Sequence, residues 1–307
     1  MYDNRSKFQV VKMAKVLGVT EAGYYAWKRR LNRPETEEET KKKTLRQAIR
    51  CIYIEYFDIY GSRKIQHELK RSYGIEVDHK VVENVMKELG IISKFTTFGC
   101  AKSQLLCNCP HLSLRLIISR KDKATTNSKH DLPVATNVLN RDFEALKPNS
   151  KMVSDITYIP TDEGWLYLAA VMDLCGDKIV GAAMGARMTK KLVIDALNDT
   201  MNRVGDTDGC ILHSDRGSQY CSVDYQNLLK AGGFVCSMSR KGNCWDNAPM
   251  ESFWGKLKQE WLNEQHFKTR EEAKKAVFEY IWIFYNRKRI HEANGYKTPE
   301  EYYNDAA

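Results

Sequence analysis

The sequence predicts an α/β fold in which a mixed five-stranded sheet is flanked by helices and preceded by an α-helical N-terminal region. From residue 151 onward, short runs rich in β-branched and aromatic residues alternate with amphipathic stretches, whereas the first 92 residues carry helix caps and helical spacing. The 307 residues, 43% hydrophobic and 28% charged, can also bury a sizeable core. We expect segments at 1–33, 34–92, 93–150, 151–265 and 266–307.

The first segment predicts two short helices around a turn. Val10–Leu17 is followed by Gly18, which can stop a helix, and Thr20 can cap a helix over Glu21–Arg30. This pattern is typical of a helix-turn-helix, and a small helical hairpin whose aromatic residues form its own core is the alternative. The second helix ends in basic residues that can meet DNA phosphates, namely Lys28, Arg29 and Arg30.

A second helical pair is expected in residues 34–92. Ser62 can cap Arg63–Tyr73 and Asp78 can cap His79–Leu89, and a glycine follows each helix. The charged run before them, residues 35–43, predicts a linker or the start of an exposed helix. We interpret the pair as another helix-turn-helix, with a plain helical hairpin as the alternative. Its candidate DNA-binding residues are Arg63 and Lys64.

Residues 93–150 predict a basic connector with an atypical cysteine-containing stretch. Cys100, Cys107, Cys109 and His111 lie within it, but their spacing fits a zinc site poorly. The nine cysteines of the chain are an odd number scattered through apolar segments, a distribution that favours reduced thiols over a disulfide framework.

Positive charge is concentrated in the N-terminal half. Residues 1–150 carry 28 Lys and Arg against 17 Asp and Glu, a balance of +11, whereas residues 151–307 carry 20 against 22, a balance of −2. This asymmetry indicates a nucleic-acid-binding region, although solvated helix faces also produce charge runs. No apolar run reaches the roughly 18 residues of a membrane span, so we expect a cytoplasmic protein that does not bind membranes.

The strands and helices of the sheet domain follow in order from residue 151. Three strands with short connections predict an antiparallel meander, and two further short strands alternate with helices. The expected strands are 152–159, 165–174, 178–184, 210–214 and 234–237. The expected helices are 189–204, 223–231, one after Asn247, and 270–285. The helix after Asn247 follows the loop 240–247 and carries an apolar stripe of Met250, Phe253, Leu257 and Trp261.

Three acids stand at positions suited to a shared metal site. Asp155 interrupts a β-branched run, Asp215 follows a buried strand, and Glu251 lies in the helix after Asn247. A buried carboxylate is costly unless it is paired, hydrogen-bonded or bound to a metal, and oxygen ligands favour Mg²⁺ or Mn²⁺ over zinc. Two such ions could activate a water or a DNA 3′-hydroxyl. As alternatives, Asp215 could be a turn former and Glu251 a residue favoured by the helix dipole.

Three further residues near these acids have expected roles. Lys258 lies two helical turns after Glu251 on nearly the same azimuth, which suits a phosphate backbone passing across the helix. Asp173 ends a strand without an acidic partner at suitable spacing, so we expect a structural role. His213 belongs to a buried strand, and a satisfied core histidine is the favoured interpretation over a metal ligand.

The acids lie in recognisable motifs: SDITYI at 154–159, HSDRGSQY at 213–220, SRKGNCWDNA at 239–248 leading into Glu251, and Tyr285-Asn286 followed by Arg289 and His291. In these motifs the chain resembles the bacterial insertion-sequence transposases whose second reading frame encodes a retroviral-integrase-like catalytic core. The resemblance implies a ribonuclease H-like fold and a metal-binding catalytic triad of Asp155, Asp215 and Glu251. It further implies DNA contacts at Lys258 and at the loop residues Arg240, Lys241, Asn243 and Asn247, although Asn243 and Asn247 could equally be structural.

The implied activity is nicking of the element's ends and joining of the freed 3′-hydroxyl to another phosphodiester. Its implied partners are the terminal inverted repeats, target DNA, other copies of the chain on DNA, and an upstream-frame protein. Two other functions remain open: a DNA-binding regulator or inactive transposase remnant, and a ribonuclease H-like hydrolase that cuts without joining.

Overall fold

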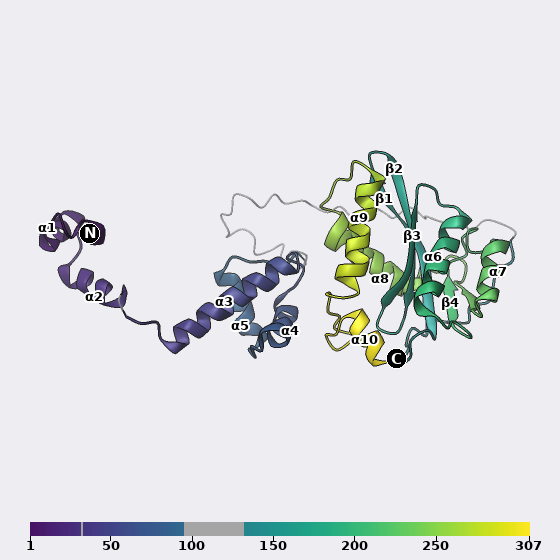
Figure 1. Ribbon diagram of the computed structural model, residues 1–307, viewed down its shortest axis with the longest axis horizontal. Coiled ribbons are helices and arrows are strands. Elements are labelled where there is room, and N and C mark those ends of the chain that lie inside the picture. The colour runs from purple at the N-terminus through teal and green to yellow at the C-terminus, as the bar shows by residue number, and fades with distance from the viewer. Residues whose placement is uncertain (32, 95–131) are drawn as a thin grey trace. The chain divides into compact units, whose positions relative to one another are not determined.

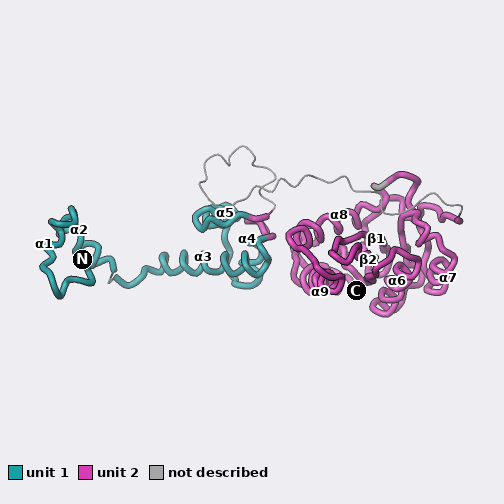
Figure 2. The backbone as a smooth tube through the Cα atoms, turned by 90° about the horizontal axis from the view of Figure 1, so that it is seen from above, with its two compact units in different colours: residues 1–58, 65–92 teal, residues 59–64, 93–307 magenta. Residues whose placement is uncertain are grey.

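The computed structural model describes residues 1–31, 33–94 and 132–307, which form two compact units (Figures 1 and 2). Unit 1 comprises residues 1–58 and 65–92, and unit 2 comprises residues 59–64 together with the chain from Ser93 to Ala307. The cysteine-containing stretch of the connector, with its weak zinc prediction, lies outside the described residues.

Unit 1 is helical, as the sequence predicts. After a short 3-10 turn at Tyr2–Asn4, its helices are α1 Val10–Leu17, α2 Glu21–Leu31, α3 Glu37–Glu55, α4 Ser62–Tyr73 and α5 His79–Glu88, and the first three residues of α4 belong to unit 2. Gly18 ends α1 with a φ of +66°, in the left-handed region that glycine adopts readily. The Asp78 side chain caps α5 by accepting from the Lys80 amide at 2.8 Å. The charged run 35–43 is thus largely the first two turns of α3 and not a linker.

Unit 2 is built on a mixed five-stranded sheet in the order β3-β2-β1-β4-β5. The strands are β1 Lys151–Thr161, β2 Gly164–Asp173, β3 Lys178–Gly185, β4 Ile211–Ser214 and β5 Val235–Met238. Strands β1, β2 and β3 form an antiparallel meander, while β4 pairs with β1 and β5 pairs with β4 in parallel. This topology confirms the predicted ribonuclease H-like sheet.

Helices cover both faces of this sheet (Figure 1). Helices α6 Lys190–Val204 and α7 Val223–Ala231 pack over a core that includes Met152 and Ile156 of β1. Helices α8 Ala248–Leu257 and α9 Arg270–Phe278 contact β1, and π-helical segments continue each of them, at Lys258–Leu262 and Glu279–Tyr285. A short 3-10 helix, Cys244–Asn247, precedes α8.

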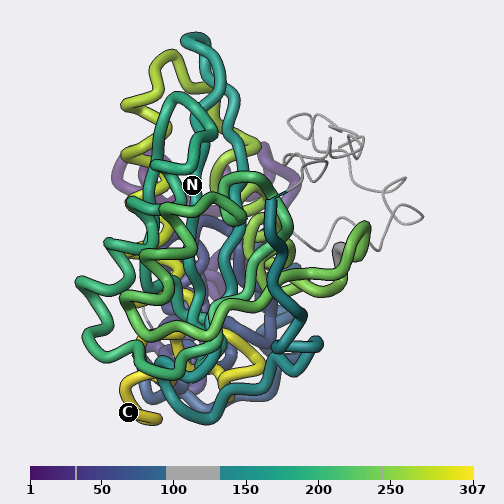
Figure 3. Tube along the Cα trace, turned by 90° about the vertical axis from the view of Figure 1, so that its right-hand side faces the viewer, coloured from purple at the N-terminus to yellow at the C-terminus, as the bar shows by residue number. Residues whose placement is uncertain are grey.

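The C-terminal helix α10, Pro299–Asp305, closes unit 2 near the start of the sheet. The Tyr303 hydroxyl donates to Asn149 Oδ1 at 2.9 Å, two residues before β1, and Figure 3 marks this end of the chain. Within residues 1–31, 33–94 and 132–307, no helix combines the length and apolar character needed to cross a bilayer.

Residues 59–64 belong to unit 2 although they precede its sheet by more than 80 positions in sequence. The Tyr60 ring is fully buried, and its hydroxyl accepts from the Ile290 amide at 2.9 Å and lies 3.3 Å from the Lys288 carbonyl as donor. The segment is therefore part of the core of unit 2 and not a passing linker.

Candidate active site

Asp155 and Asp215 are brought together by the parallel pairing of β1 and β4. The register pairs Val153 with His213, and each aspartate lies two residues further along its own chain. Neighbouring parallel strands are about 4.8 Å apart, and residues two apart on a strand point to the same face of the sheet. Asp155 and Asp215 therefore occupy corresponding positions beside each other along the pair formed by β1 and β4. Asp215 is the first residue after β4, where Oδ1 accepts from the Gly217 amide at 2.8 Å.

Helix α8 is attached to β1 on either side of Glu251. The Asn247 amide group donates to the Ser154 carbonyl at 3.2 Å, and the Trp254 indole N–H donates to Asp155 Oδ2 at 2.9 Å. Asn247, Glu251 and Trp254 are separated by four and three positions, a spacing that places them on one helical face. Glu251 therefore lies on the face of α8 that carries both contacts to β1, and it is exposed.

The electrostatics of the site are those of crowded carboxylates. Burial, and next the neighbouring charge of Asp215, raise the pKa of Asp155 to about 7, and Glu251 adds a smaller effect in the same direction. Hydrogen bonds from the Ile156 amide and the Trp254 indole oppose the rise in pKa. A nearby cation would relieve this repulsion between like charges.

The donor set fits a hard divalent cation in its chemistry, because all three side chains offer carboxylate oxygens. Within the described part of the chain, no group of three or more His, Cys, Asp or Glu side chains is arranged to hold a metal ion. The structure places Asp155 and Asp215 at corresponding positions beside each other, and it places Glu251, an exposed residue, on the face of α8 that contacts β1. The metal-binding triad stays a prediction.

Lys258 lies at the end of α8, close to the same strand. Its Nζ is 5.4 Å from the centroid of the Tyr158 ring, and Tyr158 follows Asp155 by three residues on β1. This position brings a positive charge to the strand that carries the first acid. A cation over an aromatic ring is a favourable arrangement, and Lys258 is half-buried there.

Comparisons with known proteins identify the family of the chain. Residues 145–244 and 233–299 match two families described as integrase core domain, and residues 40–97 match an HTH-like domain. The chain is 42% identical over 299 residues to the insertion element IS600 uncharacterized 31 kDa protein of Shigella sonnei, covering 96% of this chain and all of that one. It is 36% identical over 301 residues to transposase InsF for insertion sequence IS3A of Escherichia coli strain K12, covering 98% and 96%.

The chain belongs to the insertion-sequence transposases with an integrase core domain. Among solved structures, the HTLV-2 integrase catalytic core domain in complex with magnesium is similar with a TM-score of 0.40 and 16% identity, over 52% of this chain and 99% of that one. The matched HTH-like range contains α4, α5 and most of α3, which confirms the interpretation of the second helical pair.

The first helical pair of this transposase, α1 and α2, lies outside that range. Tyr24 is buried and its ring packs against Tyr25 and Trp27 at centroid distances of 5.3 and 6.0 Å. Because Tyr25 and Trp27 are themselves exposed and lie on the same helix as Tyr24, these contacts favour neither alternative. Of the predicted phosphate contacts at the end of α2, Arg29 and Arg30 are exposed and Lys28 is half-buried.

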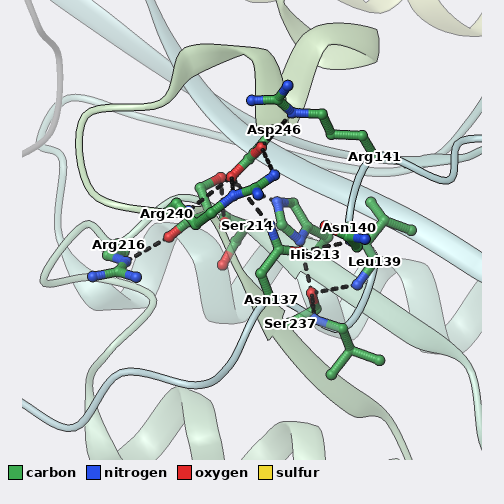
Figure 4. A network of polar contacts seen from close by, with 12 residues as sticks. Asn137, Leu139, Asn140, Arg141, His213, Ser214, Arg216, Ser237, Arg240 and Asp246 are labelled. Atoms are coloured by element: carbon green, nitrogen blue, oxygen red, sulfur yellow. Dashed lines mark hydrogen bonds and ion pairs between the residues drawn. The ribbon is translucent and has the colours of Figure 1, made fainter.

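The other predicted DNA contacts of the transposase differ in their surroundings. Arg63 is exposed, whereas burial, and next the charge of Arg289, lower the pKa of Lys64 to about 7. Lys241 is exposed in the loop before α8. The Arg240 guanidinium is engaged by the buried Asp246, as Figure 4 shows. DNA contact by each of these residues stays a prediction.

The two loop asparagines have side-chain oxygens that are available in the structure. Oδ1 of Asn243 and Oδ1 of Asn247 are buried and have no hydrogen-bond partner among the residues that the structure describes. The amide nitrogen of Asn247 holds α8 to β1, so a structural role of this residue is already evident.

The two structural expectations are fulfilled. Both ring nitrogens of the fully buried His213 are hydrogen-bonded, to Ser237 Oγ at 2.8 Å and to Ser239 Oγ at 3.0 Å, and burial lowers its pKa to about 4. Asp173 accepts from the Asn149 and Cys175 amides at 2.7 and 2.8 Å, which fixes the turns around the start of β1 and the end of β2.

Sequence reasoning missed several residues that shape the site. Trp254, which donates to Asp155, could have been found because it lies one turn after Glu251. The pair formed by Glu260 and Arg289 is nearly fully buried, and its sequence signals were an acid next to the apolar stripe and the place of Arg289 in the last motif. Asp246 is an acid inside a basic loop, and no role was predicted for it.

Proposed function

We propose that this transposase nicks the ends of its element and joins the freed 3′-hydroxyl to another phosphodiester, using Mg²⁺ or Mn²⁺ held by Asp155, Asp215 and Glu251. The observation that carries the proposal is the placement of Asp155 and Asp215 at corresponding positions along the parallel pair formed by β1 and β4. Beside them lies α8, which is attached to β1 on either side of Glu251. Family membership supports the same reaction class.

Each residue of the site has a defined task in this reaction. When bound, two divalent ions supply the charge that activates the attacking oxygen and stabilises the leaving oxygen. Asp155 and Asp215 offer oxygens held in orientation by the Trp254 indole and the Gly217 amide. Glu251, on the face of α8 that contacts β1, would complete the ligand set, and the bound cations would offset the repulsion among the three carboxylates.

The DNA partners in this proposal are the terminal inverted repeats and a target duplex. Support comes from the HTH-like match over residues 40–97 and from the +11 balance of residues 1–150. We further propose that several copies of the chain assemble on DNA together with an upstream-frame protein, and that the protein works in the cytoplasm on the bacterial nucleoid.

The decisive experiment is a strand-joining assay on labelled element ends with Mg²⁺, Mn²⁺ or chelator. Asp155→Asn keeps the size of the side chain and removes its charge, so it should abolish cleavage and joining while DNA retention in a gel-shift assay is unchanged. Asp195→Asn, at an exposed acid of α6 paired with Lys191, is the matched control and should remain active.

Three other results would contradict the proposal. Cleaved strands that are never joined would indicate a hydrolase. DNA binding by a wild-type protein that neither cuts nor joins would indicate a regulator or an inactive remnant. Cleavage by Asp155→Asn at the wild-type rate would remove this carboxylate from the site.

A further inference from the structure

The carboxylate of Asp246, in the loop before α8, accepts five hydrogen bonds. Its side chain is fully buried, and Oδ1 accepts from Arg141 Nε at 2.7 Å and from Arg240 Nη2 at 2.8 Å. Oδ2 accepts from the Arg240 amide at 2.9 Å, from Arg240 Nε at 3.0 Å and from Asn137 Nδ2 at 3.1 Å. Hydrogen bonds from Arg240 hold the pKa of Asp246 well below its ordinary value although burial opposes this.

These bonds join two parts of the chain that are about a hundred residues apart, as Figure 4 shows. Asn137 and Arg141 belong to the connector that precedes β1, whereas Arg240 and Asp246 belong to the loop between β5 and α8. Charge-assisted hydrogen bonds of this kind are among the strongest in proteins. The loop is therefore held by the connector and not by its own residues alone.

The connector is itself fixed against the end of β5. Ser237 Oγ accepts from the Val138 amide at 2.9 Å and from the Leu139 amide at 3.0 Å, and the Met238 amide donates to the Thr136 carbonyl at 3.3 Å. Ser237 also bonds the buried His213 of β4. The partners of Asp246 thus stand on a segment that is tied into the sheet.

The residue after Asp246 transmits this placement to the site. Asn247 precedes α8 directly and donates to the carbonyl of Ser154, the neighbour of Asp155. Glu251 follows Asn247 by four positions on the same helix. Because a helix is stiff, a shift of its first residue displaces the next turn by a similar amount. The position of Asp246 therefore affects the position of Glu251.

We propose that Asp246, held by Asn137 and Arg141 of the connector, is a positioning residue that sets the register of α8 and thereby the approach of Glu251 to Asp155 and Asp215. The connector residues lie outside the matched ranges 40–97, 145–244 and 233–299, so the comparisons reported above assign them no role. This inference rests on the proposed function, since it concerns the same carboxylates.

The test compares Arg141→Gln with Arg203→Gln. Both arginines pair through Nε with one carboxylate, at 2.7 and 2.9 Å, and their side chains are 43% and 46% exposed, but Arg203 lies on α6 and pairs with Asp199. Arg141→Gln should lower the single-turnover cleavage rate at saturating DNA at least tenfold and raise the Mg²⁺ concentration for half-maximal rate, with unchanged DNA affinity. Arg203→Gln should change neither.

Amide hydrogen exchange of the DNA-free, metal-free protein supplies a readout that does not depend on activity. Arg141→Gln should accelerate exchange in peptides covering 239–247 at least fivefold without affecting β1 and β2, whereas Arg203→Gln should leave 239–247 unchanged. If wild-type protein cleaves DNA and the two variants match it in rate, Mg²⁺ dependence and loop exchange, the positioning proposal is wrong. If wild-type protein does not cleave, the proposed function fails while the exchange comparison still tests the loop.

Discussion

The buried ion pair of Glu260 and Arg289 allows a stability prediction whose size follows from the structure. Their side chains are 2% and 8% exposed, Arg289 donates to both Glu260 oxygens at 2.6 to 3.1 Å, and the Tyr280 hydroxyl donates to Oε2 at 2.8 Å. Glu260→Gln leaves the arginine charge buried without a counter-charge. Breaking such a pair costs about 3–5 kcal/mol, whereas an exposed pair contributes at most about 1 kcal/mol.

Urea unfolding followed by tryptophan fluorescence measures this cost in unit 2, which contains every tryptophan except Trp27. Asp195→Asn, which breaks an exposed pair with Lys191, is the control and should change the unfolding free energy by less than about 1 kcal/mol. Arg289→Met should be as costly as Glu260→Gln, and the double variant should cost clearly less than the two together. Additive effects, or a Glu260→Gln cost equal to that of the control, would refute the reasoning.

Three further predictions concern the sheet and its acids. The pKa of His213 is lowered to about 4, so the unfolded chain binds the extra proton between pH 6.5 and 4. The unfolding free energy of wild type relative to that of His213→Gln should therefore fall by roughly 3 kcal/mol over this range as pH falls, and an equal pH dependence of the two proteins would contradict this. A Cβ at Gly181 would lie 2.0 Å from a side-chain oxygen of α6, whereas at Gly185 the nearest atom would be 3.4 Å away. Gly181→Ala should therefore lower the unfolding free energy by at least about 1–3 kcal/mol and lower the melting temperature, and a melting temperature equal to that of Gly185→Ala would be the opposing result. Trp254→Phe removes the indole donor to Asp155, and because a hydrogen bond to a charged group is worth about 1.5–3 kcal/mol, cleavage should slow roughly tenfold or more at unchanged DNA affinity, an expectation that wild-type rates in a single-turnover assay would overturn.

Local patterns were sufficient to predict most elements of this fold. Strands of the meander and helices such as Val223–Ala231 were predicted to within a few residues because hydrophobic spacing and caps are encoded in neighbouring positions. Helix α3 was underestimated because its first turns lack apolar spacing. A capping box between Thr36 and Glu39 and surface pairs such as Lys41 with Glu37 support those turns instead.

The site was predictable only in part, since its supporting contacts join distant residues. Asp155 and Trp254 are 99 positions apart, and Arg141 and Asp246 are 105 apart. No spacing rule links such pairs before the sheet order is known. Glu251 was predicted to meet the two aspartates, and the structure shows the helix that would bring it there without showing the meeting itself.

The inclusion of Tyr60 in unit 2 bears on how its catalytic part is to be produced in isolation. A recombinant fragment cut at the limits of the integrase core matches, 145 to 299, would lack this tyrosine and would leave the Ile290 amide without its acceptor. The same cut would remove Asn137 and Arg141 from Asp246. This fragment should aggregate when it is expressed. A fragment that also includes residues 59–64 and 132–144 should be soluble.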